Sequence, residues 1–218
     1  MRIIGLLGGT FNPIHLGHLR MAQALADALS FDEVRFIPSA TPPHKAAPEV
    51  SAVQRAEMVR IAIADNPLFK LDARELERIG ASYTIDTLIS LRKELGASVA
   101  LCLIMGSDAF IHLNTWARWQ ELLNYCHIIL VQRPNTIKQP KLADELAILL
   151  EENYTESIAD LSQKPAGYIH MQAITALDIS STVIRANLKT RHSIRYLVTS
   201  DVLNYIHLNR LYGPINNQ

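Results

Sequence analysis

The chain has 218 residues, 49% of them hydrophobic and 19% charged, which is enough for one substantial core with at most a small appended unit. This composition excludes an intrinsically disordered chain, which would need lower hydrophobicity and higher net charge. The 21 basic and 21 acidic residues cancel, so the sequence shows no sign of the broad basic surface of a nucleic-acid-binding protein.

Short apolar runs rich in β-branched residues alternate with longer helical patterns. Strands are expected at residues 2–7, 33–38, 69–73, 98–105, 127–132 and 168–173. Helices are expected at residues 15–29, 51–65, 82–95, 116–124, 142–152, 181–188 and 199–208. This alternation indicates right-handed βαβ units. The predicted fold class is α/β, a Rossmann-like doubly wound parallel sheet, with residues 1–190 as the main domain and residues 191–218 as a small C-terminal helical extension of it.

Proline-bearing loops are expected at residues 39–50 and 133–140. In an open parallel sheet, ligands bind beyond the carboxyl ends of the strands, where the strand order switches. The residues that follow strands are therefore the first candidates for a functional site.

The remaining bulk features favour a cytoplasmic protein. Cys102 and Cys126 lie inside apolar runs, and two isolated cysteines make neither a disulfide framework nor a metal cluster. The amino terminus begins directly with a strand pattern and lacks a signal-peptide cleavage site. Since no apolar run approaches the length that crosses a bilayer, we expect no membrane association.

The first motif is the eleven-residue string GGTFNPIHLGH, which follows the first strand and opens the first helix. Gly8 and Gly9 would let the backbone turn tightly and approach a ligand. His15 and His18 are three residues apart, so both can project from one face of the first helical turn. The N–H groups at a helix start attract phosphate, and two imidazoles there can donate to phosphate oxygens. A structural or zinc-binding histidine pair is the alternative, but no further ligand lies at suitable spacing.

This string resembles the G-x-F-x-P-x-H-x-G-H signature of the nucleotidylyltransferase superfamily. The resemblance implies that His15 and His18 bind the ATP triphosphate and stabilise the transition state. It places Gly8, Gly9, Thr10 and Phe11 in the same ATP site. Many members carry Asp where this chain has Asn12, which leaves the role of that position open.

The second motif is the string ISSTVIR near the carboxyl end. Ser180 or Ser181 is a good helix N-cap, and Arg185 follows on the same side of the helix. On its own this is an ordinary capped helix. Paired with the first motif, it resembles the I-S-[ST]-[ST]-x-[IV]-R element that closes the ATP site in the superfamily. The resemblance implies ATP contacts for Ile179, Ser180, Ser181 and Arg185, and a catalytic role for Arg185 beside His15 and His18.

Several middle segments bear on a second substrate. His44 and Lys45 are potential cations in a stiff proline loop, and Thr84 opens a helix whose N–H groups could receive a carboxylate. Gly106 permits close approach of a ligand, and Asp108 could accept from a ribose hydroxyl. Trp116 or Trp119 could stack on an aromatic ring. An exposed loop, a helix cap and core packing are the respective structural alternatives.

These segments occur in the order seen in the bacterial nicotinate-nucleotide adenylyltransferase family, which the chain resembles over about residues 3–212. The resemblance implies that Thr84 and Trp116 hold a nicotinate ring and that His44 and Lys45 face the mononucleotide phosphate. It adds Gly106, Asp108 and Arg133 to the mononucleotide site. It also implies ATP and nicotinate mononucleotide as the molecules bound, with the oligomeric state open and a homo-oligomer an option.

The expected reaction is adenylyl transfer from ATP to nicotinate mononucleotide by direct in-line attack, without a covalent intermediate. The product would be nicotinate adenine dinucleotide (deamido-NAD), with release of pyrophosphate, as in NAD biosynthesis. Mg²⁺ would bridge the phosphates, held mainly by substrate oxygens and water rather than by a protein metal site. The alternatives are another phosphorylated acceptor, nicotinamide mononucleotide or phosphopantetheine, and a non-catalytic nucleotide-binding regulator. The regulator would have lost a phosphate-handling residue, whereas His15, His18, Ser181 and Arg185 are all present.

Overall fold

The computed structural model describes residues 1–40, 49–78, 80–132 and 142–213. Six parallel strands form one sheet: β1 (Arg2–Gly9), β2 (Glu33–Pro38), β3 (Phe69–Leu71), β4 (Val99–Gly106), β5 (His127–Gln132) and β6 (Ile169–Ala173). Their order is β3-β2-β1-β4-β5-β6, so the chain winds outward in both directions from the β1/β4 pair. The structure confirms the predicted doubly wound Rossmann-like sheet.

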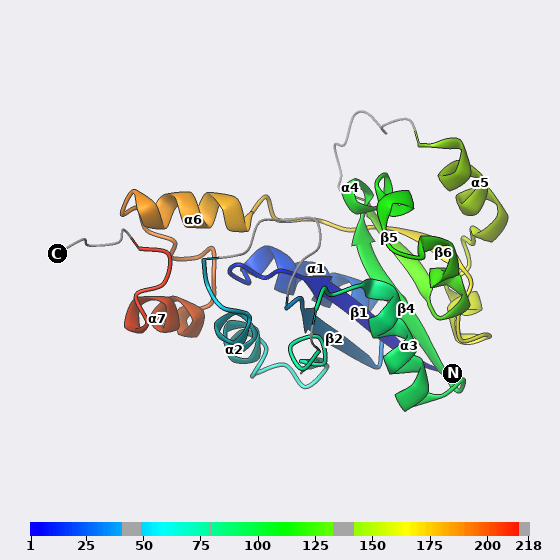
Figure 1. Cartoon of the computed structure of the whole chain (residues 1–218), viewed down its shortest axis with the longest axis horizontal. Helices are drawn as coiled ribbons and strands as arrows, with labels where there is room; N and C mark the ends of the chain where they lie inside the picture. The colour runs from blue at the N-terminus through cyan, green and yellow to red at the C-terminus, as the bar shows by residue number, and fades with distance from the viewer. Residues whose placement is uncertain (41–48, 79, 133–141, 214–218) are drawn as a thin grey trace.

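The helices flank this sheet (Figure 1). They are α1 (Leu16–Leu29), α2 (Ala52–Ala62), α3 (Thr84–Leu95), α4 (Ser107–Phe110), α5 (Asp144–Asn153), α6 (Ser181–Lys189) and α7 (Ser200–Leu208). Three 3₁₀ segments, η1 (Leu113–Thr115), η2 (Trp119–Asn124) and η3 (Ile158–Ser162), complete the described elements. Among the described residues, no helix combines the length and apolar character needed to span a bilayer.

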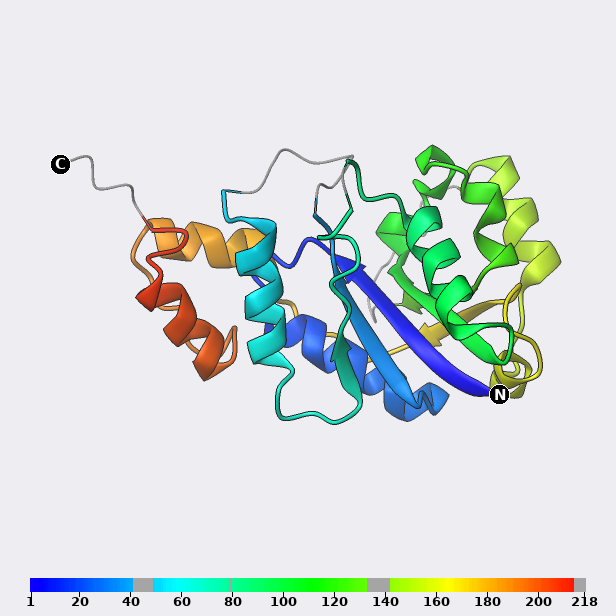
Figure 2. The ribbon, with the colours of Figure 1, turned by 60° about the horizontal axis from the view of Figure 1, so that its bottom comes forward.

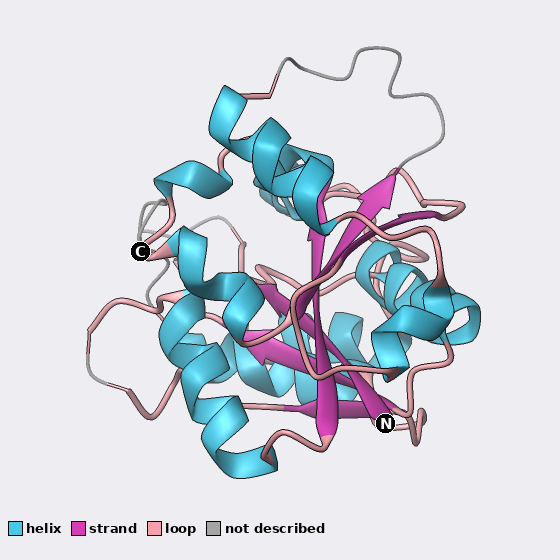
Figure 3. Cartoon of the chain, turned by 90° about the vertical axis from the view of Figure 1, so that its right-hand side faces the viewer, coloured by secondary structure: helices cyan, strands magenta, loops and turns pink. Residues whose placement is uncertain are grey.

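Alternating side chains of the strands supply two cores, one on each face of the sheet. On β4, Cys102 and Ile104 pack on one face while Leu101 and Leu103 pack on the other. Helices α1 and α2 pack on the first face, and α3 packs on the second. Figures 2 and 3 show helices on both sides of the strands. Burial on both faces explains why the strands read as continuous apolar runs.

The C-terminal segment packs into the main core. Ile194, Val198, Val202, Ile206 and Tyr212 belong to the same buried cluster as the apolar residues of α1 and α2. In Figure 1, α2, α6 and α7 lie together at one end of the molecule, and α2 and α7 are in contact. These side chains therefore share one buried cluster with α1 and α2.

The prediction of one helix at residues 116–124 is wrong. Trp116 has an extended backbone, and Arg118 has a φ of 52°, in the left-handed region. The polypeptide here forms η1 and η2, separated by this break. A residue in the left-handed region interrupts a helix, because its backbone cannot continue the right-handed hydrogen-bond ladder.

Candidate active site

A cavity of about 910 Å³ opens at the carboxyl ends of the central strands. Its lining includes Gly8 and Gly9 from the end of β1, Met105 and Gly106 from the end of β4, and Ser39 just after β2. Strands β1 and β4 are the adjacent pair from which the chain winds in opposite directions. The cavity therefore lies at the strand-order switch, where the sequence placed the functional residues.

The turn after β1 differs from the expectation that Gly8 and Gly9 would make it. Both glycines are strand residues, paired with Ile37 and Pro38 of β2. The chain turns later, at Phe11, which has a φ of 46°, and at the cis Asn12–Pro13 peptide. A Cβ at Gly8 would meet no atom within 4 Å, which leaves this stretch of backbone open to close approach by a ligand.

The two motif histidines lie against each other at the start of α1. His15 is the N-cap with an extended backbone, and His18 occupies the third helical position. Their rings stack with centroids 3.7 Å apart, and the Phe11 ring meets His18 edge-on at 5.1 Å. Phe11 is only 3% exposed, so its side chain supports His18 from within the core.

One hydrogen bond fixes which nitrogen of His18 can donate. The backbone N–H of His15 donates to His18 Nδ1 at 3.3 Å, so Nδ1 is the acceptor and Nε2 carries the proton of the neutral ring. Burial, with a smaller contribution from neighbouring His15, lowers the pKa of His18 from 6.5 to about 3. The free protein therefore presents His18 as a neutral donor.

The second motif opens α6 and bonds to the backbone of the first. Ser180 caps the helix, its Oγ accepting from the Val183 N–H at 3.2 Å. Ser181 Oγ donates to the Pro13 carbonyl at 2.9 Å, and Arg185 Nη1 donates to the Asn12 carbonyl at 2.8 Å. Two segments about 170 residues apart in sequence are thus joined directly.

A second cavity of about 260 Å³ adjoins the first on the α6 side. Ile179, Ser180 and Ser181 line it, together with His15, Gly17 and apolar residues that follow β6. A Cβ at Gly17 would lie 3.0 Å from His15 Nδ1, so the glycine leaves room for that ring. His18 and Met21 of α1 line both cavities, which places the His18 ring at their junction.

Four of the residues expected to contact a second ligand line the larger cavity: Thr84, Gly106, Asp108 and Trp116. They come from the start of α3, the end of β4, the start of α4 and the residue after η1. Trp119 does not line it and packs against the second core instead. His44, Lys45 and Arg133 lie outside the residues that the structure describes.

A buried polar network in the larger cavity was not predicted. Glu75 is 8% exposed and accepts a hydrogen bond from Thr87 Oγ1 at 2.7 Å, while Ser82 also bonds to it. Ser82 Oγ in turn accepts from the Ala40 N–H at 3.1 Å, and burial raises the pKa of the Glu75 carboxyl. Glu75 follows β3, so its place after a strand end was the signal that could have identified it. His112 also lines this cavity.

The two adjoining cavities can hold two ligands end to end. The larger cavity offers strand-end backbone, an aromatic ring and a carboxylate, and the smaller one offers apolar walls and a capped helix start. Among the described residues, no group of three or more His, Cys, Asp and Glu could hold a metal ion. The neutral His18 donor at the junction faces the region where the two ligands would meet.

Comparison with known proteins gives a consistent family. The cytidylyltransferase-like family profile matches residues 6–187. A probable nicotinate-nucleotide adenylyltransferase of Halorhodospira halophila is 48% identical over 202 residues, which are 93% of this chain and 91% of that protein. One from Pseudomonas putida (strain GB-1) is 46% identical over 216 residues, 99% of this chain and 97% of the relative.

Solved structures share the fold. The nicotinic acid mononucleotide adenylyltransferase of Plasmodium falciparum, complexed with NaAD, superposes with a TM-score of 0.71 at 17% identity, over 97% of this chain and 98% of that one. The structure of a putative nicotinate-nucleotide adenylyltransferase from Vibrio parahaemolyticus gives a TM-score of 0.63 at 16% identity, over 97% and 96% of the chains. The family profile and the near-full-length sequence matches show that the chain belongs to the cytidylyltransferase-like family and, within it, to the nicotinate-nucleotide adenylyltransferases.

Proposed function

We propose that this enzyme transfers the adenylyl group of ATP to nicotinate mononucleotide, forming nicotinate adenine dinucleotide and pyrophosphate. One observation carries the proposal: two cavities of different character adjoin at the His18 ring. A reaction that joins two nucleotides requires two such sites, with a donor where the reacting phosphates meet.

ATP occupies the smaller cavity and the junction. Its adenosine lies against the apolar residues beside Ile179 and Ser180, and its phosphates lie along Gly8, Gly9 and Thr10 at the carboxyl end of β1. His18 donates from Nε2 to a phosphate oxygen, and the stacked His15 holds the His18 ring in place. Arg185 and Ser181 hold the backbone of the first motif through the Asn12 and Pro13 carbonyls.

Nicotinate mononucleotide occupies the larger cavity. Trp116 stacks on the pyridinium ring, whose positive charge favours an aromatic face. The start of α3 at Thr84 supplies N–H groups for the carboxylate, since no side chain caps this helix among the described residues. Asp108 accepts from a ribose hydroxyl beside Gly106. His44, Lys45 and Arg133 belong to the mononucleotide site by resemblance alone.

The chemical step is an in-line displacement at the α-phosphorus of ATP. A phosphate oxygen of the mononucleotide forms the new P–O bond, and the bond from the α-phosphorus to the bridging oxygen of pyrophosphate breaks. The nucleophile is already an anion, so no general base and no covalent intermediate are needed. Catalysis then consists of positioning and of neutralising charge on the phosphate oxygens, to which His18 contributes a hydrogen bond from Nε2.

A divalent metal accompanies ATP in this scheme, and we assign it as Mg²⁺. The donor set fits this ion, because Mg²⁺ keeps most of its ligands as water and phosphate oxygens and takes few from protein. Asp108, which lines the larger cavity, could provide an outer contact through water. Bound Mg²⁺ would supply charge neutralisation on the leaving pyrophosphate.

The direct test measures pyrophosphate release from ATP and Mg²⁺, with nicotinate mononucleotide and nicotinamide mononucleotide compared as acceptors. A strong preference for the nicotinate form supports both the reaction and a carboxylate subsite near Thr84 and Trp116. Equal use of the two would remove the acid selectivity. If neither acceptor supports pyrophosphate release, the proposed substrate is contradicted, and 4′-phosphopantetheine would then be tried.

A further inference from the structure

The loop of residues 10–13 is tethered by side chains from three distant parts of the chain. Ser181 and Arg185 of the second motif hold its Pro13 and Asn12 carbonyls. Two further tethers come from residues in neither motif, Arg55 of α2 and Tyr212 beyond α7. We propose that Arg55 and Tyr212 are positioning residues that hold this loop in the conformation that receives the ATP phosphates, an inference that rests on the proposed function.

Arg55 is a fully buried arginine whose described partners are all backbone carbonyls. Nη1 donates to the Thr10 carbonyl at 2.5 Å, and Nη2 donates to the carbonyls of Ser39 and Ala40 at 2.7 and 3.1 Å. By contrast, Arg35 pairs with three carboxylates. A buried cation without a described carboxylate partner is costly, so its retention here points to a specific task.

That task is to join the segments after β1 and β2. Thr10 follows β1, and Ser39 and Ala40 follow β2. The N–H of a trans peptide points opposite to its C=O, so with the Thr10 carbonyl held by Arg55 the Phe11 N–H points away from α2. No described residue accepts from this N–H, and unpaired backbone donors of this kind suit a phosphate oxygen.

Tyr212 fixes the other end of the loop. Its ring is 4% exposed within the core shared by α1 and α2, and its hydroxyl donates to Asn12 Oδ1 at 2.7 Å. Arg185 holds the backbone carbonyl of the same Asn12. Asn12 is therefore fixed through both its side chain and its backbone. This assigns the Asn12 side chain a role as the acceptor that links the C-terminal segment to the loop.

The test compares Tyr212→Phe, Asn12→Ala and the double variant with the wild-type enzyme. Isothermal titration gives the affinity for a non-hydrolysable ATP analogue with Mg²⁺ and, separately, for nicotinate mononucleotide. We expect each single variant to bind the ATP analogue about fivefold more weakly, the size of one lost hydrogen bond, with mononucleotide affinity within twofold of wild type. The double variant should be no worse than the weaker single variant, because both lose the same contact.

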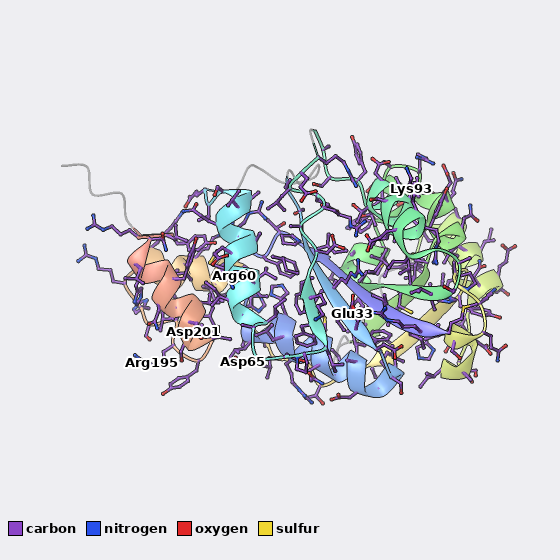
Figure 4. All side chains as sticks on the ribbon, turned by 90° about the horizontal axis from the view of Figure 1, so that it is seen from below. Glu33, Arg60, Asp65, Lys93, Arg195 and Asp201 are labelled. Carbon is purple, nitrogen blue, oxygen red and sulfur yellow. The ribbon has the colours of Figure 1, made fainter. Side chains whose placement is uncertain are left out.

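Tyr205→Phe is the matched control for Tyr212. It removes a hydroxyl from the same C-terminal unit, and the Tyr205 hydroxyl has no hydrogen-bond partner within the described part of the chain. Arg55→Lys keeps the charge but cannot reach three carbonyls, so we expect weaker ATP-analogue binding and a lower kcat. Arg60→Lys, on the exposed side of the same helix (Figure 4), should match wild type in both.

Three results would overturn the proposal. One is wild-type ATP-analogue affinity in Tyr212→Phe and Arg55→Lys. The second is an equal loss of affinity for both nucleotides, which would indicate general damage. The third is a loss of unfolding free energy with ATP binding unchanged, which would make both residues merely structural. Because analogue binding is measured without an acceptor, a wrong acceptor assignment would show only in the activity assay and would leave this test intact.

Discussion

At the scale of single residues, the most informative side chain is His18. Its Nδ1 accepts a hydrogen bond from the His15 N–H, and its ring contacts the His15 and Phe11 rings. Only Nε2 remains to donate toward the junction of the two cavities. The surroundings thus select one tautomer and one direction for the proton, which is the kind of preorganisation that stabilises a transition state.

Replacing His18 with alanine should lower kcat by at least ~10²-fold while the fold survives, since loss of one preorganised donor has that size of effect. Steady-state rates of pyrophosphate release measure the change, and circular dichroism checks the fold. His207→Ala, an exposed histidine on α7, is the control and should keep wild-type kcat. An unchanged kcat in His18→Ala would remove His18 from the mechanism.

The lowered pKa of His18 predicts a pH dependence of stability. In the unfolded chain the ring takes up a proton near pH 6.5, whereas in the folded protein it does so only near pH 3. Between these values the unfolded state binds more protons, so this group lowers the free energy of unfolding as pH falls from about 6.5 toward 3. Above pH 6.5 the effect is absent.

Urea unfolding at several pH values measures this slope, with His18→Asn as the comparison. The variant lacks the titrating group, so its free energy of unfolding should decline less than that of wild type below pH 6.5. Nitrogen NMR of the free protein at pH 5 should show a neutral His18 ring. A protonated ring at that pH would contradict both expectations.

At the scale of elements, the start of α3 depends on the buried network around Glu75. The carboxylate accepts from Thr87 and Ser82, and Ser82 also accepts from the Ala40 N–H, so the segments after β2 and β3 are tied to the helix start. Thr84, proposed to receive the nicotinate carboxylate, lies between Ser82 and Thr87. The network therefore sets where the helix N–H groups point.

Glu75→Ala should raise the KM for nicotinate mononucleotide more than the KM for ATP, because the helix start loses its anchor. It should also lower the free energy of unfolding by about 1–3 kcal/mol, the cost of leaving the buried Thr87 hydroxyl without its acceptor. Glu75→Gln keeps an acceptor oxygen, so its KM for nicotinate mononucleotide and its free energy of unfolding should both stay closer to the wild-type values. Glu77→Gln, exposed and two residues away, is the control. Equal changes in the two KM values would argue against a role confined to the acceptor pocket.

The segment after β4 presents Trp116 to the same cavity. Trp116→Ala should raise the KM for the mononucleotide more than that for ATP, because a stacking partner of the pyridinium ring is lost. Trp119→Phe changes a neighbouring indole that packs in the core and should leave both KM values near wild type. Equal effects of Trp116→Ala on the two substrates would argue against stacking.

Local sequence signals predicted some of these elements and missed others. Apolar runs located all six strands, because burial on both faces leaves few polar interruptions. The prediction of a helix at residues 116–124 was wrong because Arg118 adopts a left-handed conformation, which the residue pattern around it does not indicate. Likewise, Thr84, Asp108 and Trp116 were found as residues following strands or opening helices. The partners of Arg55 and Tyr212 lie 45 and 200 residues away and were invisible to local patterns.

At the scale of the whole molecule, the sheet order explains why the two motifs can meet although they lie at opposite ends of the chain. Strand β1 is central in the sheet, so the loop that follows it lies at the switch in strand order. After the outer strand β6, the chain returns toward this loop and forms α6 beside it. Hydrogen bonds from Ser181 and Arg185 to the Pro13 and Asn12 carbonyls then join the two motifs. The proposed ATP site is thereby assembled from both ends of the fold.

This closure predicts how the protein unfolds. We assign residues 191–218 to the same domain as residues 1–190, because the side chains that follow α6 join the core of α1 and α2. Shared burial of this kind couples the two parts, so chemical denaturation should be one cooperative transition. Tryptophan fluorescence reports on Trp116 and Trp119, which pack against the opposite face of the sheet, whereas far-ultraviolet circular dichroism reports on all helices. Coincident midpoints of the two signals are expected, and an early loss of helix signal at constant fluorescence would instead show that the C-terminal helices unfold as a separate unit.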